Sequence, residues 1–179
     1  MRRAARLAVL VVVILGLLLA PARPTRVTGP LHEIGGVLLG FAASAHRVVD
    51  ADVVRVVDGD TIHVRIAERI ERVRYIGVNA PELHHPRRGA EPGGREAADV
   101  NHGIVSGKHV RLEFDVRERD RYGRLLAYVW VGDVMVNAEL IRRGYVQVMT
   151  VPPNVRYQSL FVKLERAARE SGRGLWRRV

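Results

Sequence analysis

Short segments in which apolar and polar residues alternate recur from residue 51 onward, and this period of two predicts β-strands. Asp58 and Gly59 form a turn signal between the first two segments, which are therefore predicted to pair as a hairpin. Five short strands in one chain favour a closed barrel. The predicted strands are residues 53–57, 62–66, 73–78, 110–116 and 125–131.

Three other segments place apolar residues at helical spacing. The first spans Arg95 to Ser106 and stops at Gly107. The second spans Asn137 to Arg143, with Asn137 as N-cap and Gly144 at its end. Strands and helices together predict an α+β domain. The last helix carries one apolar stripe, which we expect to pack on the core: Tyr157, Leu160, Phe161, Leu164, Ala168 and Leu175.

The N-terminus has a different pattern, with three early arginines followed by an unbroken apolar run from Leu7 to Ala20. Fourteen apolar residues are fewer than the roughly 20 of a bilayer span, and the pattern is typical of a signal peptide. We predict that residues 1–22 are a signal peptide or a membrane anchor, that residues 23–50 are a linker, and that residues 51–179 are the domain. Either reading predicts an exported protein, secreted or anchored on the extracytoplasmic side.

Composition narrows the class of protein without naming a substrate. The 179 residues suffice for one domain, and their formal net charge of +10 comes almost wholly from arginine, because Lys108 and Lys163 are the only lysines. Such a surface attracts polyanions, either nucleic acid or anionic lipid, although a proteome rich in arginine would produce the same excess. The absence of cysteine excludes disulfide bonds, thiolate zinc sites and cysteine nucleophiles.

Three motifs carry polar side chains to the ends of predicted strands. Residues 58–61 (DGDT) form the first hairpin turn, residues 74–82 place an arginine before Asn79 and Glu82, and residues 120–128 place Arg124 at the start of a strand. Each motif alone has a structural explanation, since Asp and Gly are common in turns. The three together are specific.

From residue 53 to residue 176 the chain resembles the staphylococcal nuclease (thermonuclease) family. The resemblance rests on the DGDT turn, the R-x(5)-A-P-E segment, the H-P-R-R-G loop at residues 85–89, the D-R-Y-G-R-x-L-A-Y run and the closing G-L-W. It implies a five-stranded OB-fold β-barrel with three helices and one bound calcium ion. It also implies hydrolysis of DNA or RNA that leaves 3′-phosphate ends.

Hydrolysis of a phosphodiester needs a water molecule, a base that activates it, and positive charge on the transition state. The resemblance implies that Glu82 is the general base and that Arg74 and Arg124 clamp the phosphate. A guanidinium suits this role because its planar fork can bind two phosphate oxygens and stays charged. The structural alternatives are a solvated loop acid for Glu82 and barrel salt bridges for the arginines.

The implied metal site departs from the family at one position. Asp60 resembles the principal calcium ligand, and Ala80 the residue whose backbone carbonyl contributes. Asn79 stands where the family has a second carboxylate. An amide oxygen can ligate calcium but adds no charge, so we expect weaker calcium binding or a different metal preference.

The substrate pocket departs further. Tyr122 remains for stacking on a base, and Arg87 and Arg88 match a basic loop that could follow the phosphate backbone. Residues 150–152 replace tyrosines that the family places near its last helix, and Tyr145 is a candidate to compensate. Nucleotide preference therefore does not carry over from the resemblance.

Two other classes of protein compete with a nuclease. One is a non-catalytic OB-fold binder of nucleic acid with an impaired metal site, which would need the arginines but not Asp60 and Glu82. The other is a membrane-surface scaffold, in which the apolar N-terminus provides the membrane association but the three motifs have no purpose. We predict a monomeric calcium-dependent nuclease acting on DNA, RNA or both.

Overall fold

The computed structural model describes residues 46–83 and 89–177. The predicted signal peptide or anchor, most of the predicted linker, and Arg87 and Arg88 lie outside the described residues. Within the described ranges no helix combines the length and hydropathy of a bilayer span.

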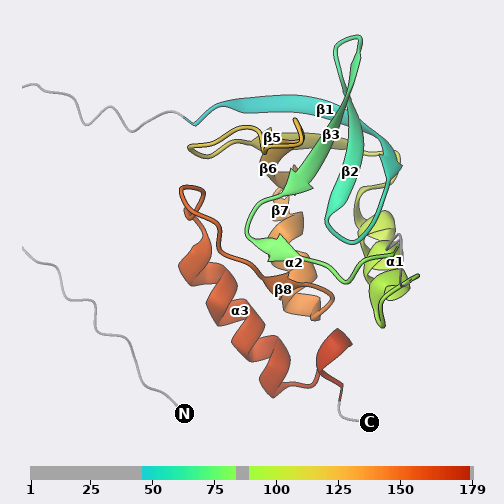
Figure 1. Cartoon of the computed structure of the whole chain (residues 1–179), viewed down its shortest axis with the longest axis vertical. Helices are drawn as coiled ribbons and strands as arrows, with labels where there is room; N and C mark the ends of the chain where they lie inside the picture. The colour runs from blue at the N-terminus through green and yellow to red at the C-terminus, as the bar shows by residue number, and fades with distance from the viewer. Residues whose placement is uncertain (1–45, 84–88, 178–179) are drawn as a thin grey trace, which may run out of the picture. The chain divides into compact units, whose positions relative to one another are not determined.

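Five long strands close into a barrel, as the sequence predicts (Figure 1). The neighbours β3, β2, β1, β5 and β6 are antiparallel, and a parallel pairing of β3 with β6 completes the circle. The parallel pairing joins residues 73–75 of β3 to residues 125–127 of β6. The strands are β1 (Val48–Val56), β2 (Thr61–Ile66), β3 (Arg69–Tyr75), β5 (His109–Glu113) and β6 (Leu125–Val131).

Strand β3 starts and ends earlier than the predicted strand of residues 73–78, because it runs from Arg69 to Tyr75 and the chain turns at Gly77. This glycine has a φ of 78°, and a Cβ there would lie 2.7 Å from the ring of Phe161. Beyond the turn, β4 (Val78–Asn79) leaves the barrel and pairs with β8 (Gln147–Val148). The turn therefore places Asn79 beside the barrel rather than in it.

Strand β1 starts earlier than the predicted strand. It begins at Val48, and Val48, Val49 and Asp50 pair with β5. The short strand β7 (Val134–Met135) extends the sheet beyond β6.

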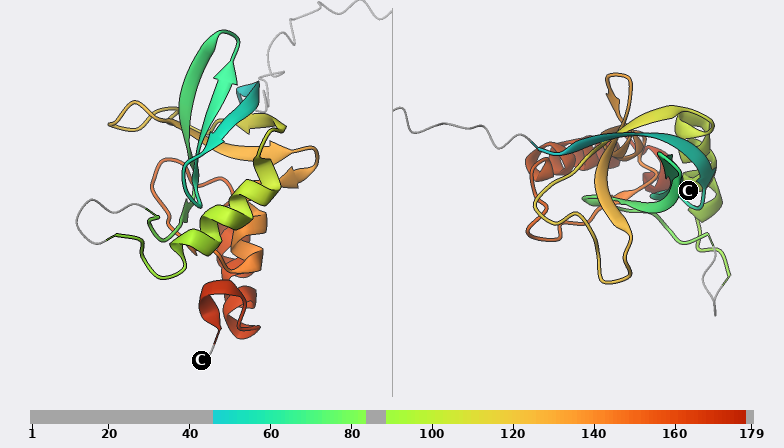
Figure 2. Two further views of the ribbon diagram at one scale, coloured as in Figure 1. Left: turned by 90° about the vertical axis from the view of Figure 1, so that its right-hand side faces the viewer. Right: turned by 90° about the horizontal axis from the view of Figure 1, so that it is seen from above.

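The three helices lie below the barrel in Figure 1 and in the left view of Figure 2. They are α1 (Gly94–Val105), α2 (Val136–Arg143) and α3 (Gln158–Glu170), and the short 3-10 helix η1 (Gly174–Trp176) follows them. Phe161 and Ala168 of the predicted stripe are buried, whereas Leu160 is 42% exposed and does not reach the core.

The prediction that Asn137 caps α2 is wrong. The N-cap is Met135, and Asn137 is fully buried inside the helix. Its side chain accepts a hydrogen bond from Val129 N at 2.9 Å and donates one to Ile76 O at 2.9 Å. The amide thus satisfies backbone groups of the barrel end rather than of its own helix.

Candidate active site

The turn between β1 and β2 holds Asp60 in place. The Asp58 carboxylate accepts a hydrogen bond from Asp60 N at 3.0 Å, and Asn101 of α1 donates to Asp58 O at 2.9 Å. Gly59 allows close approach, because a Cβ there would lie 2.6 Å from the Cβ of Ala80. The turn, the strand end and α1 therefore fix one another.

Asp60 is buried and hydrogen-bonded through both carboxylate oxygens. Oδ1 accepts from Thr61 Oγ1 at 3.0 Å, and Oδ2 accepts from Ala80 N at 2.6 Å and pairs with Arg74 Nη2 at 3.0 Å. Burial raises the pKa of the Asp60 carboxyl to about 7, and the neighbouring Arg74 opposes this rise. The positive charge of Arg74 thus compensates the buried carboxylate only in part.

Arg74 joins the predicted metal ligands to one another. Its Nη1 donates to Tyr75 O at 2.8 Å and to Val78 O at 2.7 Å, and its Nη2 donates to Asn79 Oδ1 at 3.1 Å. Three of its five N–H groups thus have protein acceptors, and Nη2 also forms the ion pair with Asp60. The guanidinium is therefore held rigidly at the end of β3.

A cavity of about 500 Å³ borders Arg74 and is lined by most of the predicted site residues. It is lined from separate parts of the chain, by the end of β3, by the loop before β6 and by the segment after β8. Asp60 and Ala80 are not among the residues that line it, although Asp60 pairs with Arg74, which does. The predicted site residues that line it are Arg74, Asn79, Glu82, Tyr122 and Arg124.

Arg124 has more free donors than Arg74. Its Nε donates to Asp120 Oδ2 at 2.7 Å, and within the described ranges its two Nη groups make no hydrogen bond. The exposed ring of Tyr122 lies at the cavity edge, with the guanidinium carbon of Arg124 5.6 Å and that of Arg121 4.7 Å from its centroid. Arg124 can therefore offer a two-pronged contact to an anion in the cavity.

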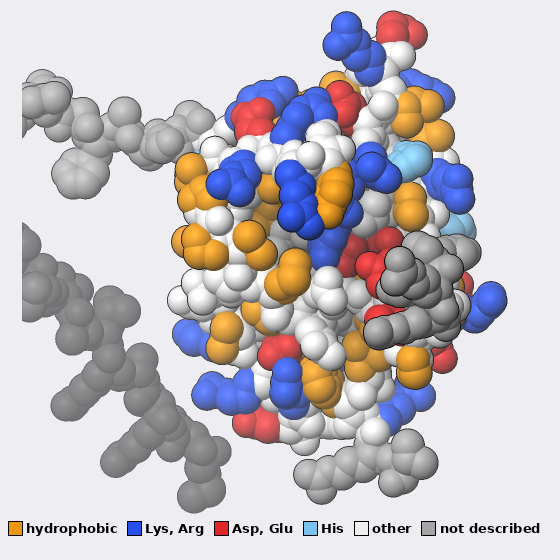
Figure 3. Space-filling view, viewed as in Figure 1, with side chains coloured by type: hydrophobic (Ala, Val, Ile, Leu, Met, Phe, Trp, Pro, Cys, Tyr) orange, Lys and Arg blue, Asp and Glu red, His pale blue; other side chains and the backbone are white. Residues whose placement is uncertain are grey.

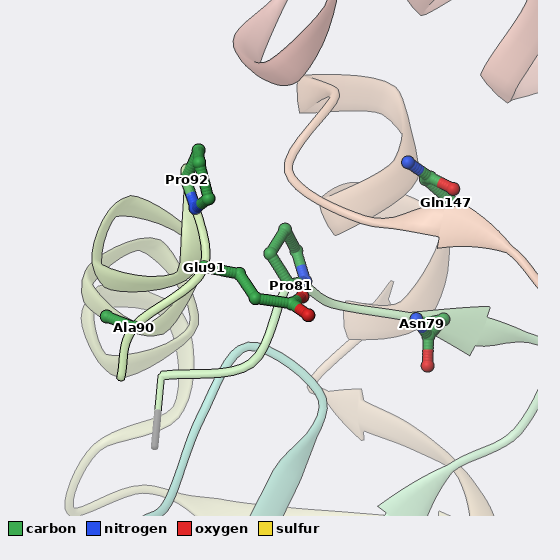
Figure 4. A pocket seen from close by; sticks show the side chains of 6 residues that line it. All are labelled: Asn79, Pro81, Ala90, Glu91, Pro92 and Gln147. Atoms are coloured by element: carbon green, nitrogen blue, oxygen red, sulfur yellow. The ribbon is translucent and has the colours of Figure 1, made fainter. Parts of the chain in front are cut away.

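Glu82 is exposed, and its backbone is held by Glu91. Glu82 N donates to Glu91 Oε2 at 3.0 Å, and Glu91 N donates to Glu82 O at 2.8 Å. Figure 4 shows Glu91 reaching from the segment before α1 to Pro81, beside a second cavity of about 520 Å³ that also borders Asn79. Gly94 packs against the same backbone, because a Cβ there would lie 2.7 Å from Glu82 O. Glu91 thus holds the backbone of Glu82 through two hydrogen bonds.

The oxygen atoms near Arg74 are of the chemical types that bind a hard cation such as calcium. Asp60 Oδ2 and Asn79 Oδ1 lie 3.0 and 3.1 Å from the same Arg74 nitrogen, so they are at most 6.1 Å apart (3.0 + 3.1). Carboxylate and amide oxygens are calcium ligands, but this set has one carboxylate, already paired with Arg74. Among the residues that the structure describes, no three His, Cys, Asp or Glu side chains form a metal-binding group.

Some predicted substrate residues are not brought to the cavity, and others were missed. Tyr145 lies beside Arg142 and Arg143 instead, because α2 carries it to the other end of the domain. Arg117, Met149 and Asn154 line the cavity although no sequence motif singled them out. Asn154 is buried and bonded to the backbone of Arg117 at 2.8 and 2.7 Å, a pairing across 37 residues that no local pattern signals.

Comparison with known proteins gives consistent matches. The model of the family described as staphylococcal nuclease homologue matches residues 72–178. Thermonucleases of Staphylococcus hyicus and Staphylococcus intermedius are each 39% identical to the chain over 124 residues, which are 69% of this chain and 73% and 74% of the relatives. An SPbeta prophage-derived endonuclease of Bacillus subtilis is 37% identical over 132 residues, 73% of this chain and 45% of the relative.

Proposed function

This chain belongs to the staphylococcal nuclease family, and from that membership we propose that it is a calcium-dependent nuclease that hydrolyses phosphodiester bonds of DNA, RNA or both. The relatives named thermonuclease and endonuclease support nuclease activity for this chain. The observation that carries the proposal is that Arg74 and Glu82 of one motif and Arg124 of another line one cavity.

In the proposed reaction Glu82 is the general base. Its carboxylate accepts a proton from water as the water oxygen bonds to phosphorus; the ester P–O bond breaks, and the leaving oxygen takes a proton from solvent. Glu82 is exposed at the cavity, so it can reach a water molecule there. The backbone bonds to Glu91 fix where its side chain begins.

The two arginines have different roles in this proposal. Arg124 keeps both Nη groups available for two phosphate oxygens, so it is the main clamp. Arg74 contributes mainly positive charge, since three of its five N–H groups already donate to the protein and Nη2 pairs with Asp60. Positive charge held rigidly beside the phosphate stabilises the charge that develops in the transition state.

Asp60 and Asn79, with the Ala80 carbonyl, would hold the calcium ion. The ion would supply positive charge next to the phosphate. Because Arg74 already compensates part of the Asp60 charge and Asn79 adds none, we infer weak calcium binding in the absence of substrate.

The test is cleavage of single-stranded DNA and of RNA by the full chain, with calcium and with chelator, beside Glu82→Gln. We expect cleavage that needs calcium and falls by about 100-fold or more in Glu82→Gln, as for loss of a general base. Glu96→Gln, on the first turn of α1, is the matched control and should cleave normally. A wild-type chain that binds both polymers but cuts neither would replace the nuclease with the non-catalytic binder.

A further inference from the structure

A row of basic side chains continues from the candidate site across the outer face of the barrel. Arg72 precedes Arg74 by two residues on β3, so the two side chains lie on the same face of the strand, about 7 Å apart. The partner of Arg72 across the β2–β3 ladder is His63, and the partner of His63 across the β1–β2 ladder is Arg55. Arg65 lies two residues beyond His63 on the same face of β2. We call Arg55, His63, Arg65 and Arg72 the basic strip.

The register of β1 helps to build the strip. It shifts between Val53 and Arg55, which leaves Val54 as an extra, exposed residue and brings Arg55 opposite His63. Paired residues on adjacent strands lie about 5 Å apart, so three strands contribute neighbouring side chains. Figure 3 shows basic side chains, with a histidine among them, over the upper part of the domain where the hairpin lies in Figure 1.

The arginines of the strip are not neutralised by ion pairs with nearby acidic side chains. In the described part of the chain Arg55, Arg65 and Arg72 form no ion pair. The acidic residues closest in register are engaged elsewhere, since Asp52 contacts His109 at 3.0 Å and Glu71 contacts Arg119 at 2.8 Å. The three arginines are exposed to solvent. A row of exposed, unpaired guanidinium groups is a surface for a polyanion.

We propose that the basic strip binds the phosphate backbone of a single-stranded polynucleotide and leads it into the cavity at Arg74. This proposal rests on the proposed nuclease function and extends its substrate from one phosphodiester to a longer strand. The strip ends beside Arg74, because Arg72 and Arg74 are neighbours on one face of β3, so a strand bound along it runs into the site. It holds no Phe, Tyr or Trp on which bases could stack, so its arginines contact phosphates, and these contacts do not depend on base sequence.

The test compares long and short substrates in the full chain with calcium. The long one is a single-stranded DNA of about 30 nucleotides, longer than the roughly 4–16 nucleotides that one OB domain covers. The short one is a dinucleotide, which fits the cavity alone. The variant Arg65→Gln/Arg72→Gln removes two charges from the strip, and Lys163→Gln/Arg166→Gln removes two from α3 as a matched control.

For the strip variant we expect the KM of the long substrate to rise about five- to tenfold with little change in kcat, and dinucleotide kinetics to stay unchanged. The slope of log KM against log salt should fall by about 1.4, which corresponds to two lost phosphate contacts. Arg65→Lys/Arg72→Lys should retain most of the affinity, which separates lost charge from misfolding. An unchanged KM, an equal rise in the α3 control, or an equal loss on the dinucleotide would overturn the proposal.

Two further experiments distinguish this proposal from failure of the nuclease function and from binding to a membrane. If the wild-type chain cleaves neither substrate, the nuclease function fails, and fluorescence anisotropy of the labelled 30-nucleotide strand with the same variants still tests the strip. Sedimentation with phosphatidylglycerol vesicles tests a membrane instead. Loss of vesicle binding in the strip variant, with strand binding intact, would assign the strip to lipid and overturn the proposal.

Discussion

At the scale of single residues, Asn79 limits the charge of the candidate site. It accepts a hydrogen bond from Arg74 at 3.1 Å and borders both cavities. In Asn79→Asp a second carboxylate would face the cation site, and calcium affinity rises with the charge of its ligands. We expect the calcium dissociation constant, measured by calorimetry, to fall about tenfold and cleavage at limiting calcium to become faster. Gln158→Glu adds the same charge at the start of α3 and should change neither quantity.

Glu91 is a second residue with a testable role, as the positioning residue for Glu82. Glu91→Ala removes the acceptor of Glu82 N but leaves the general base itself. A small displacement of a base can slow a reaction strongly, so we expect kcat to fall about tenfold with KM nearly unchanged. Steady-state kinetics measure this split, and Glu96→Ala on α1 is the control. A change in KM alone would show that Glu91 shapes the substrate cavity rather than the base.

At the scale of elements, the Glu139 carboxylate forms ion pairs with two arginines in the last turn of α2. Arg142 donates to Glu139 at 2.6 and 2.7 Å and Arg143 at 2.6 Å. The hydrogen bonds from Arg142 do most to lower the pKa of Glu139 to about 2 from a usual 4.5, and Arg143 adds to them. Because the folded-state pKa is the lower one, this stabilisation is present above about pH 4.5 and is lost as pH falls towards 2.

We therefore expect Glu139→Gln to lower the free energy of unfolding at pH 7 by about 0.5–1 kcal/mol, since the two arginines are half exposed. Urea unfolding at pH 7, 4 and 3 should show the gap to wild type closing as the pH falls. Glu170→Gln, whose ion pair with Arg166 is long and exposed, should show no such gap. A gap of constant size at all three pH values would mean that packing rather than charge explains the effect.

At the scale of the whole molecule, the start of β1 lengthens the pairing of β1 with β5 in the barrel. Val48, Val49 and Asp50 pair with β5, and Phe114 N donates to Arg47 O at 2.9 Å. A chain of residues 51–179 lacks these pairings, and one of residues 46–179 keeps them. The loss of about three hydrogen bonds, each worth about 1 kcal/mol, should lower Tm by roughly 10 °C. Thermal unfolding followed by circular dichroism measures the difference, and equal Tm values would show that the barrel does not need this segment.

The alternation of apolar residues and the turn residues between them determined most of the barrel. Ile62 and Val64 point inwards because a strand has a period of two, so their pattern is visible in any short window of sequence. The three helices follow from the same local logic. The motifs that carry the family resemblance also singled out Arg74, Glu82 and Arg124, which line one cavity, and their catalytic roles stay a prediction.

Only the tertiary structure decided what those residues contact. Arg74 contacts both Asp60 and Asn79, and Glu91 accepts a hydrogen bond from Glu82 N. The buried Asn137 accepts one from Val129 N. Each of these contacts joins atoms from different parts of the fold. The basic strip likewise depends on the register of three strands and on the shift in β1. Hydrogen bonds and ion pairs select partners by distance in space, and local periodicity constrains only residues that are close in the chain.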